Sequence, residues 1–292
     1  MCHTETAPTV LLGPQLNRKL SRPMARKVLT SLKSILKDAQ RRGNVAQNVA
    51  AAVVIKKDKR TENVKLKVGV DIPTTQEVGV IIGAAKGRWR PVLMTAAFVG
   101  LRASELRGLR WKDVDLKGEK IHVRQRADRL NQIGRPKSAA GDREIPLRPI
   151  VLQTLREWKL VCPKGDLGLV FPNGDGGIEN LSNILQRGFQ PAQVTAGVMV
   201  PAKDEHGKPL RDGNGKPVFV AKYYGIHSLR HFHASWLINR KADGGLELPP
   251  KEVQTRLGHS SITMTLDVYG HLFPRGREDV EITDLERSLS LA

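Results

Sequence analysis

The side chains best suited to chemistry are a tyrosine, a histidine and an arginine in two separate stretches. Tyr269 lies near the end of a short amphipathic segment, residues 257–272, and a phenol that loses its proton can act as a nucleophile. His227 and Arg230 lie three residues apart, so a helix would turn both to the same side. A lone tyrosine is more often a packed or surface residue, and the histidines of residues 226–238 can equally lack any role. The residues alone leave both interpretations open.

Two further stretches carry charged candidates. Arg102 follows a glycine at an expected helix end, and Glu105 lies three residues later. A buried arginine at this point would need a partner, and Glu105 could supply it or orient a neighbour. The alternative is an ordinary surface ion pair. Lys137 lies on an expected turn between two strands, where a lysine is normally just solvated.

Metal and nucleotide sites have little support in the sequence. His231 and His233 could join another histidine at a metal, but no set of further ligands at a suitable spacing is evident. Cys2 and Cys162 are too few for a disulfide scaffold or a cysteine-rich zinc site. Residues 213–216 lack the spacing of a phosphate-binding loop. We therefore expect no metal and no cofactor.

The elements that must position these residues are mostly helical. Leu229, Phe232 and Trp236 would anchor a helix over 226–238. Ser260 or Ser261 would cap the helix that carries Tyr269, and Met264, Val268 and Leu272 would line one face of that helix. A capping box formed by Thr74 and Glu77 opens another helix. Further helices are expected over 91–99, 149–160 and 180–189, and strands over 120–124 and 143–147, with Ile121 and Val123 on one face.

The N-terminal part has a different pattern. Residues 1–20 look irregular, and helices are expected over 21–42 and 46–55, before a charged linker over 56–67. The first helix has an apolar stripe and many basic residues, which form either a solvated face or a DNA-facing surface. The candidates for DNA contact are Arg22, Arg26, Lys33, Lys37 and Arg41. Residues 191–222 are rich in turn formers and predict a surface hairpin or flexible loop, and no internal repeat is evident.

Charge is the strongest feature of the composition. The 292 residues carry 48 Lys and Arg against 29 Asp and Glu, a net charge of +19. Such a balance favours a polyanionic partner, and nucleic acid comes first. Hydrophobic residues make up 40% of the chain, which is enough for a core. No apolar run is long enough to span a bilayer, and the two cysteines fit a reducing cytosol.

All these stretches, in their order along the chain, resemble the tyrosine recombinase or phage integrase family. The resemblance covers roughly residues 72–275 and is carried by 100–106, by Lys137 ahead of 143–147, by His227 to Arg230, by 257–259 and by Tyr269. It implies a mostly α fold with a small antiparallel β-sheet (α+β). Residues 1–70 would be a partial helical core-binding domain with a linker, and residues 71–292 a catalytic domain with an insertion at about 191–222.

The resemblance also implies a mechanism without metal or ATP. Tyr269 would attack the DNA phosphate and form a 3′-phosphotyrosine bond. Arg102 and Arg230 would bind the phosphate. His227 would take the proton of Tyr269, and His259 would donate a hydrogen bond to the phosphate. Lys137 would protonate the leaving 5′ oxygen, with Glu105 in support.

The implied partner is double-stranded DNA, bound by a homotetramer on synapsed sites, with accessory DNA-bending proteins possible and no membrane. The expected function is integration or excision of a prophage or mobile element in the bacterial cytoplasm, at the nucleoid. Two alternatives stay open: a type IB topoisomerase-like enzyme, and a truncated, non-catalytic DNA-binding remnant. The second arises because only two helices of the core-binding domain are expected. A helix over 279–291 would pack on a neighbouring protomer or on its own domain.

Overall fold

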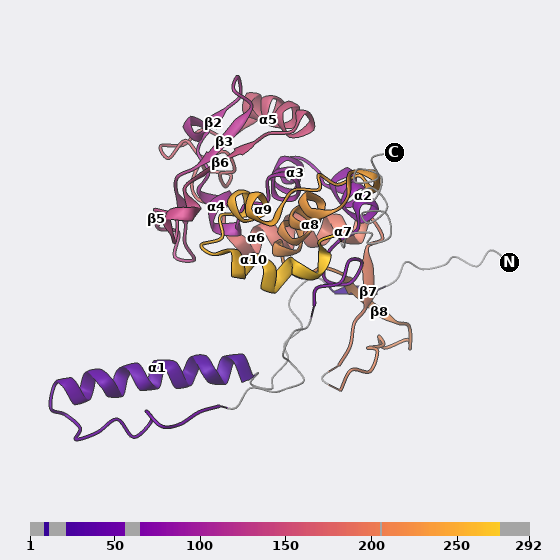
Figure 1. Ribbon diagram of the computed structural model, residues 1–292. Helices are drawn as coiled ribbons and strands as arrows, with labels where there is room; N and C mark the ends of the chain where they lie inside the picture. Colours follow the sequence, from indigo (N-terminus) through magenta and orange to yellow (C-terminus); the bar gives the residue numbers. More distant parts are fainter. Residues whose placement is uncertain (1–8, 12–21, 56–64, 205, 275–292) are drawn as a thin grey trace, which may run out of the picture. The chain divides into compact units, whose positions relative to one another are not determined.

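A computed structural model describes residues 9–11, 22–55, 65–204 and 206–274. The chain divides into two compact units (Figure 1). The larger unit consists of residues 1–13, 65–202 and 209–292, and the smaller consists of 14–64 with 203–208. Both the tail at 279–291 and most of the expected linker lie outside the described residues.

The larger unit is built on helices, as expected for the fold class. Thr74 caps the first of them: its hydroxyl accepts a hydrogen bond from the Glu77 N–H at 3.2 Å, and the Glu77 carboxylate accepts from the Thr74 N–H at 2.9 Å. The capping box expected from the sequence is therefore confirmed. The helices before the sheet are α2 (Thr75–Ala84), α3 (Trp89–Val99) and α4 (Ala103–Gly108), and those at the C-terminal end are α8 (His227–Ile238), α9 (Pro250–Leu257) and α10 (Ile262–Tyr269).

A small antiparallel sheet follows α4 and confirms the two expected strands. Its order is β2 (Val114–Asp115), β3 (Lys120–Val123) and β6 (Arg143–Pro146). Ile121 pairs with Ile145, and both side chains are fully buried. A separate hairpin, β4 (Arg126–Ala127) with β5 (Ile133–Gly134), lies between β3 and β6 in the sequence. The alternation of strand residues thus sends one face of the sheet into the core.

The helices after the sheet also match their expected ranges. α5 spans Pro149–Val161, against an expected 149–160. The helix expected over 180–189 begins as α6 (Leu181–Asn183) and continues through a π-helical turn (Ile184–Phe189) into α7 (Gln190–Thr195). One large hydrophobic cluster joins α2, α3, α5, α8 and the sheet. A smaller cluster joins the end of α8 to α9 and Tyr269.

Residues 199–221 carry a hairpin of β7 (Met199–Pro201) and β8 (Val218–Ala221), so the expected hairpin is confirmed there. The expectation is wrong at the start of 191–222, because α7 continues to Thr195. A third strand, β1 (Thr9–Leu11), runs parallel to β8. The prediction that residues 1–20 are irregular is therefore wrong at Thr9–Leu11, where backbone pairing to a distant edge strand decides the structure.

The hairpin also contains a repeat that we did not expect from the sequence. The hexapeptides 204–209 and 212–217 share the pattern Asp-x-x-Gly-Lys-Pro. The Asp212 carboxylate accepts hydrogen bonds from the N–H groups of Asn214 and Lys216, each at 2.9 Å. Asp204 does the same two and four residues on. Both turns are therefore closed by one aspartate side chain.

The smaller unit has one described helix, α1 (Arg22–Arg41). Residues 46–55, where a second helix was expected, form turns instead, so that prediction is wrong. Side-chain contacts to α1 hold this segment: Asn48 Nδ2 donates to the Lys33 carbonyl at 2.9 Å, and Gln40 Nε2 donates to the Ala46 carbonyl at 3.2 Å. These side-chain hydrogen bonds to backbone carbonyls stabilise the turns. A helix would instead pair backbone N–H groups with carbonyls of its own segment.

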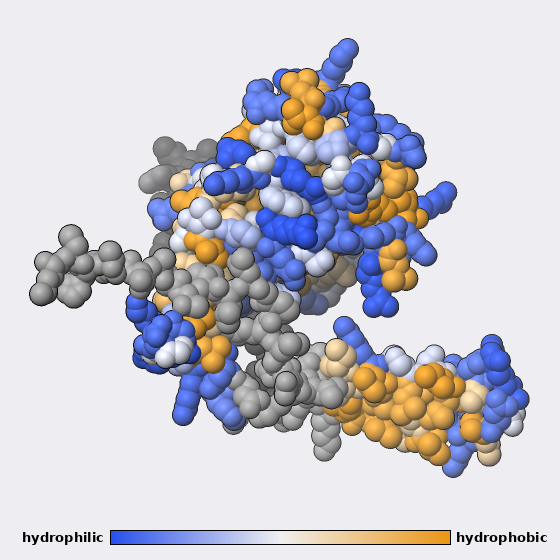
Figure 2. All heavy atoms as spheres, turned by 180° about the vertical axis from the view of Figure 1, so that it is seen from behind, coloured by the Kyte–Doolittle hydropathy of each residue, from blue (hydrophilic) through white to orange (hydrophobic). Residues whose placement is uncertain are grey.

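The apolar stripe of α1 is largely uncovered in the described unit. Val28, Leu32 and Ile35 are exposed, and Figure 2 shows the hydrophobic side chains gathered along this helix. No helix in the described ranges is long and apolar enough to cross a membrane.

Candidate active site

Arg102 is held by contacts on both sides of its guanidinium group. It is the residue before α4, and its Nη1 donates to Glu105 Oε1 at 2.7 Å. Its Nη2 donates to the carbonyl of Gly258 at 2.8 Å. The Glu105 carboxylate also accepts the backbone N–H of Arg102 at 3.0 Å. The interpretation of Glu105 as an orienting partner therefore fits, and the surface ion pair does not, since Glu105 is only 3% exposed.

Arg143 is a member of this cluster that sequence reasoning noted only as part of a strand. Its Nη2 donates to Glu105 Oε2 at 2.9 Å, while its Nε and Nη1 donate to the carbonyls of Arg256 and Gly141. Burial raises the pKa of Glu105, but the charges and hydrogen bonds of Arg143 and Arg102 outweigh it and hold that pKa below its usual value. The strand alternation was the available signal, because it places Arg143 on the same buried face as Ile145.

Arg230 is among the most buried charged residues that the structure describes, at 2% exposed. Its Nη1 donates to the Gly100 carbonyl at 2.6 Å and its Nη2 to the Leu257 carbonyl at 2.5 Å. Both carbonyls lie at helix C-terminal ends, where carbonyl groups lack helical partners and favour a cation. Burial, and then the charge of Arg102, lowers the pKa of Arg230 to about 9.

The two arginines meet at adjacent carbonyls of one chain turn. Arg230 binds the carbonyl of Leu257 and Arg102 binds that of Gly258. Gly258 ends α9 with φ +64°, a conformation that suits glycine. A Cβ there would lie 2.7 Å from Arg143 Nη1 and 2.9 Å from the Ala140 carbonyl oxygen. Gly258 is therefore required for two reasons: its φ is positive, and its neighbours leave no space for a Cβ.

Tyr269 is buried at the end of α10, close to these arginines. Ser261 caps the helix, as one of the two expected serines, by accepting the Met264 N–H at 3.3 Å. Of the three apolar residues expected on one face, Val268 and Leu272 are partly buried against the core. Met264 is 43% exposed, whereas Thr265 and Tyr269 are buried. These two residues are four apart, so they share the face that meets the rest of the domain.

The hydroxyl of Tyr269 bonds to His231. The distance from His231 Nδ1 to Tyr269 Oη is 2.8 Å. Sequence reasoning considered His231 only as a metal ligand, although its position four residues after His227 was a signal for a shared helix face. Burial raises the pKa of Tyr269 to about 12, and the charges of Arg230 and Arg102 oppose the rise.

His227 and His259 flank this pair. The ring of His227 meets the ring of His231 edge-on, with centroids 4.6 Å apart. The ring of His259 lies parallel to that of Tyr269 at 6.3 Å, and His259 Nδ1 is 2.9 Å from the Thr265 hydroxyl. Burial, and then Arg230 and Arg102, lowers the pKa of both histidines, that of His259 to about 4.

Lys137 is on the surface, unlike the buried residues of this group. It lies between β5 and a 3-10 turn at Ala139–Gly141, and its side chain is exposed. Its expected place on a turn is confirmed. The same loop reaches the arginine cluster three residues later, since the Ala140 carbonyl lies beside Gly258. No group of three His, Cys, Asp or Glu side chains in the described ranges is arranged to hold a metal ion.

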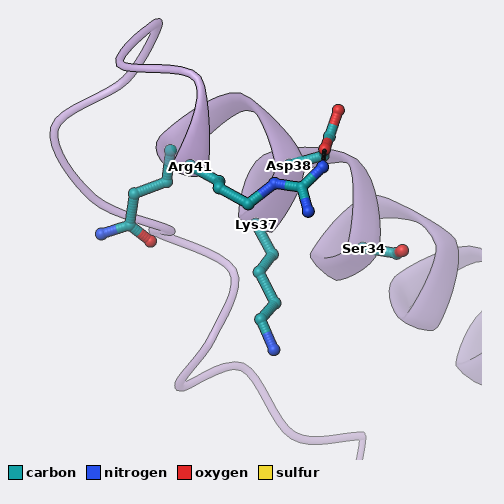
Figure 3. A pocket seen from close by; sticks show the side chains of 5 residues that line it. Ser34, Lys37, Asp38 and Arg41 are labelled. Carbon is teal, nitrogen blue, oxygen red and sulfur yellow. Dashed lines mark hydrogen bonds and ion pairs between the residues drawn. The ribbon is translucent and has the colours of Figure 1, made fainter.

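The DNA-contact candidates on α1 are partly engaged within their own unit. Lys33 Nζ donates to the Ala51 carbonyl at 2.8 Å, and Arg41 pairs with Asp38 at 2.7 Å. Lys37 and Arg41 line a shallow pocket together with Ser34 and Asp38 (Figure 3). Arg26 lies on the same helix, and the side chain of Arg22 is outside the described part.

The arrangement is suited to binding an anion next to a phenol. Two guanidinium groups are fixed by carbonyls, a neutral histidine touches the phenol, and a second histidine lies beside it. Such preorganised donors stabilise negative charge that develops during a reaction.

Known recombinases and integrases are similar to this chain in sequence. Tyrosine recombinase XerC of Xylella fastidiosa (strain 9a5c) is 30% identical over 237 residues, covering 80% of this chain and 64% of that protein. Prophage integrase IntR of Escherichia coli (strain K12) is 27% identical over 216 residues, covering 73% of this chain and 50% of that protein. The chain thus spans about half to two thirds of the length of these relatives.

Solved structures share the fold. The Tn1549 transposon integrase in complex with circular intermediate DNA matches with a TM-score of 0.59 at 21% identity, covering 92% of this chain and 80% of that chain. XerH recombinase bound to difH substrate matches with a TM-score of 0.53 at 16% identity, covering 92% and 66%. A sequence model of the phage integrase family matches residues 74–275. Since this match covers more than half of the chain, the protein belongs to the phage integrase family of tyrosine recombinases.

Proposed function

We propose that the chain is a site-specific DNA recombinase that cuts and rejoins DNA through Tyr269. The observation that carries this proposal is one buried tyrosine packed beside two arginines already held by backbone carbonyls. A phosphodiester is anionic and repels nucleophiles. Guanidinium groups neutralise the charge that grows on its non-bridging oxygens, a part that magnesium has in many phosphoryl transfers.

Each step follows from one side chain. Tyr269 Oη attacks the phosphorus, and the bond to the 5′ oxygen breaks. That alkoxide is a poor leaving group, so Lys137 delivers a proton to it. The exposed loop around Lys137 suits a residue that arrives with the DNA. The product is a 3′-phosphotyrosine and a free 5′-hydroxyl, and because the link keeps its bond energy, rejoining needs no ATP.

His259 has a protonation state that suits phosphate binding. When the Thr265 hydroxyl donates to Nδ1, the single proton of the neutral ring lies on Nε2. That N–H can be given to a phosphate oxygen. His227 belongs to the same catalytic set, with Arg102, Arg230 and Lys137, and Glu105 orients Arg102.

The proposed partner is double-stranded DNA, recombined by a homotetramer, with accessory bending proteins where the sites require them. The relatives named for a prophage and a transposon favour a mobile element. Contacts outside the catalytic centre would come from the basic side chains of α1: Arg22, Arg26, Lys33, Lys37 and Arg41.

A covalent-trapping assay tests the function. The protein is mixed with nicked duplexes that carry candidate attachment sequences, in EDTA and without ATP, and run on a denaturing gel. We expect a DNA-linked band that Tyr269→Phe abolishes. The matched control is Tyr224→Phe, since Tyr224 is a surface tyrosine at 58% exposure, and this variant should keep the band. DNA binding without any band would contradict the proposal and favour a non-catalytic binder.

The strand-exchange assay then separates recombinase from topoisomerase. We expect synapsis of two duplexes and exchanged products from paired sites. Relaxation of a supercoiled plasmid with no exchange would instead assign the type IB topoisomerase-like activity.

Salt dependence tests the electrostatic part of the proposal. The net charge of +19 predicts that binding displaces condensed counterions from DNA. If about six to ten phosphates are contacted, affinity should fall by roughly 10³ to 10⁵ between 50 and 200 mM salt. Fluorescence anisotropy with a labelled duplex measures this, and an affinity that stays flat over that range would contradict the proposal.

A further inference from the structure

We propose that His231, and not His227, takes the proton from Tyr269 when the tyrosine attacks DNA; this rests on the proposed recombinase function. His231 Nδ1 is 2.8 Å from Tyr269 Oη, within direct proton-transfer reach. Within the described residues, the Tyr269 hydroxyl has no other hydrogen bond. His231 therefore touches the reacting atom itself.

The described contact of His227 is with His231. Its imidazole packs edge-on against His231, with centroids 4.6 Å apart. The described structure gives it neither a hydrogen bond nor a ring contact with Tyr269. The two histidines lie four apart on α8, so they share one face of the helix. Of the two, His231 is the one whose ring nitrogen is hydrogen-bonded to the Tyr269 hydroxyl.

The environment keeps His231 neutral before DNA binds. Burial, and then the nearby His227 and Arg230, lowers its pKa to about 4, while Asp71 opposes the shift. The groups that face it are His227 and Arg230 on α8, Tyr269 on α10, and Asp71 from the segment before α2. A neutral imidazole has one nitrogen free to accept a proton, which an imidazolium lacks.

The pKa values also decide when the proton moves. Burial raises the pKa of Tyr269 to about 12 and lowers that of His231 to about 4. Both shifts disfavour complete proton transfer before the attack. The proton must therefore move while the Oη–P bond forms. An incoming phosphate favours this, because its negative charge stabilises the new imidazolium.

The step balances in atoms and charge. The Tyr269 proton passes to His231 Nδ1, Oη bonds to phosphorus, the P–O5′ bond breaks, and the 5′ oxygen takes a proton from the Lys137 ammonium. Rejoining runs backwards: a 5′-hydroxyl attacks the phosphotyrosine, gives its proton to Lys137, and His231 returns its proton to Oη.

A kinetic experiment separates His231 from His227. Single-turnover cleavage is measured with a duplex that has sulfur in place of the bridging 5′ oxygen, so that departure needs no acid. The variants are His231→Ala and His227→Ala, each with ordinary tyrosine and with fluorotyrosine, a more acidic phenol. Circular dichroism confirms that each variant folds, and His231→Gln replaces His231→Ala if the latter does not.

We expect His231→Ala to cleave about 10² to 10⁴ times more slowly than the wild type. Its rate should rise tenfold per pH unit between pH 7 and 9, because hydroxide then removes the proton. Fluorotyrosine and added imidazole should restore much of the rate. His227→Ala should show no such rise of the rate with pH, and neither fluorotyrosine nor imidazole should restore its rate. The reverse pattern, with the signs in His227→Ala only, would overturn the proposal.

A second measurement needs no cleavage, so it remains decisive if the proposed function fails. The ¹⁵N shifts of the His231 ring in the DNA-free protein report which nitrogen carries the proton. We expect a proton on Nε2 and an accepting Nδ1 whose shift changes in Tyr269→Phe. A proton on Nδ1 would mean that His231 donates to Tyr269, and the proposal would be wrong. Failure of the proposed function would show separately, as a wild type that forms no phosphotyrosine.

Discussion

At the residue scale, the site depends on a carboxylate shared by two arginines. Glu105 binds Arg102 at 2.7 Å and Arg143 at 2.9 Å. Removing one member of a buried ion pair leaves charge without compensation, which is far costlier than breaking an exposed pair. Glu105 therefore orients the first arginine and also stabilises the fold around it.

This arrangement makes Glu105→Gln a sharp test. The variant keeps the side-chain size but loses the charge that compensates Arg143, so we expect the free energy of unfolding to fall by about 3–5 kcal/mol. Urea unfolding followed by fluorescence measures it. The control is Glu144→Gln, which breaks an exposed pair with Lys120 and should change stability little. Equal effects of the two substitutions would show that the buried cluster is no more important than a surface pair.

At the element scale, the ends of helices build the site. α3 ends at Gly100 and α9 at Gly258, both in the left-handed conformation. These ends direct carbonyls at Arg230 and Arg102. The two arginines are thus positioned by backbone whose path only glycine follows easily.

Gly258→Ala tests whether crowding of the added Cβ lowers stability beyond the cost of the positive φ. Gly197 has a similar φ of +71° but nothing within 4 Å of a new Cβ, so Gly197→Ala measures the conformational cost alone, about 1–2 kcal/mol. At Gly258 the Cβ would also crowd Arg143 and the Ala140 carbonyl, and overpacking adds about 1–3 kcal/mol. Urea midpoints of the two variants should differ accordingly. Equal losses of stability in the two variants would mean that the Arg143 side chain moves aside at no energetic cost.

Many of the helix caps and strands were predictable from the sequence. Local signals were sufficient for the capping box at Thr74 and for the strands around Ile121 and Ile145. The same holds for the serine cap before α10. Each depends on neighbours within a few residues, which a sequence displays directly.

Features that depend on distant contacts were not predictable. The apolar pattern of α10 placed Met264 on an apolar face, yet the domain buries Thr265 and Tyr269, because His259 and His231 bond to those polar groups. Residues 46–55 have helical spacing, but contacts to α1 hold them in turns. β1 pairs with β8 about two hundred residues away. Tertiary contacts override local preference in each case.

At the scale of the whole molecule, the buried histidines couple stability to pH. Burial and nearby arginines lower the pKa of His227, His231, His233 and His259. The folded state therefore binds fewer protons than the unfolded state below about pH 6.5, the ordinary histidine value. By linkage, stability rises with pH across this window and is lost as the pH falls through it. The lowered pKa of Glu105 has the same sign but acts only at more acidic pH.

His233 provides the clearest test, because it is fully buried and its pKa is lowered to about 3. Between pH 6.5 and 4.5 this one residue should cost the fold on the order of 2–3 kcal/mol. In His233→Gln the slope of the unfolding free energy against pH should flatten by up to about 1.4 kcal/mol per pH unit. The slope is the readout, because the substitution also lowers stability at every pH. The control His206→Gln, on an exposed turn, should keep the wild-type slope. An unchanged slope in His233→Gln would mean that His233 is protonated in the folded protein, and that Arg230 tolerates a further buried positive charge nearby.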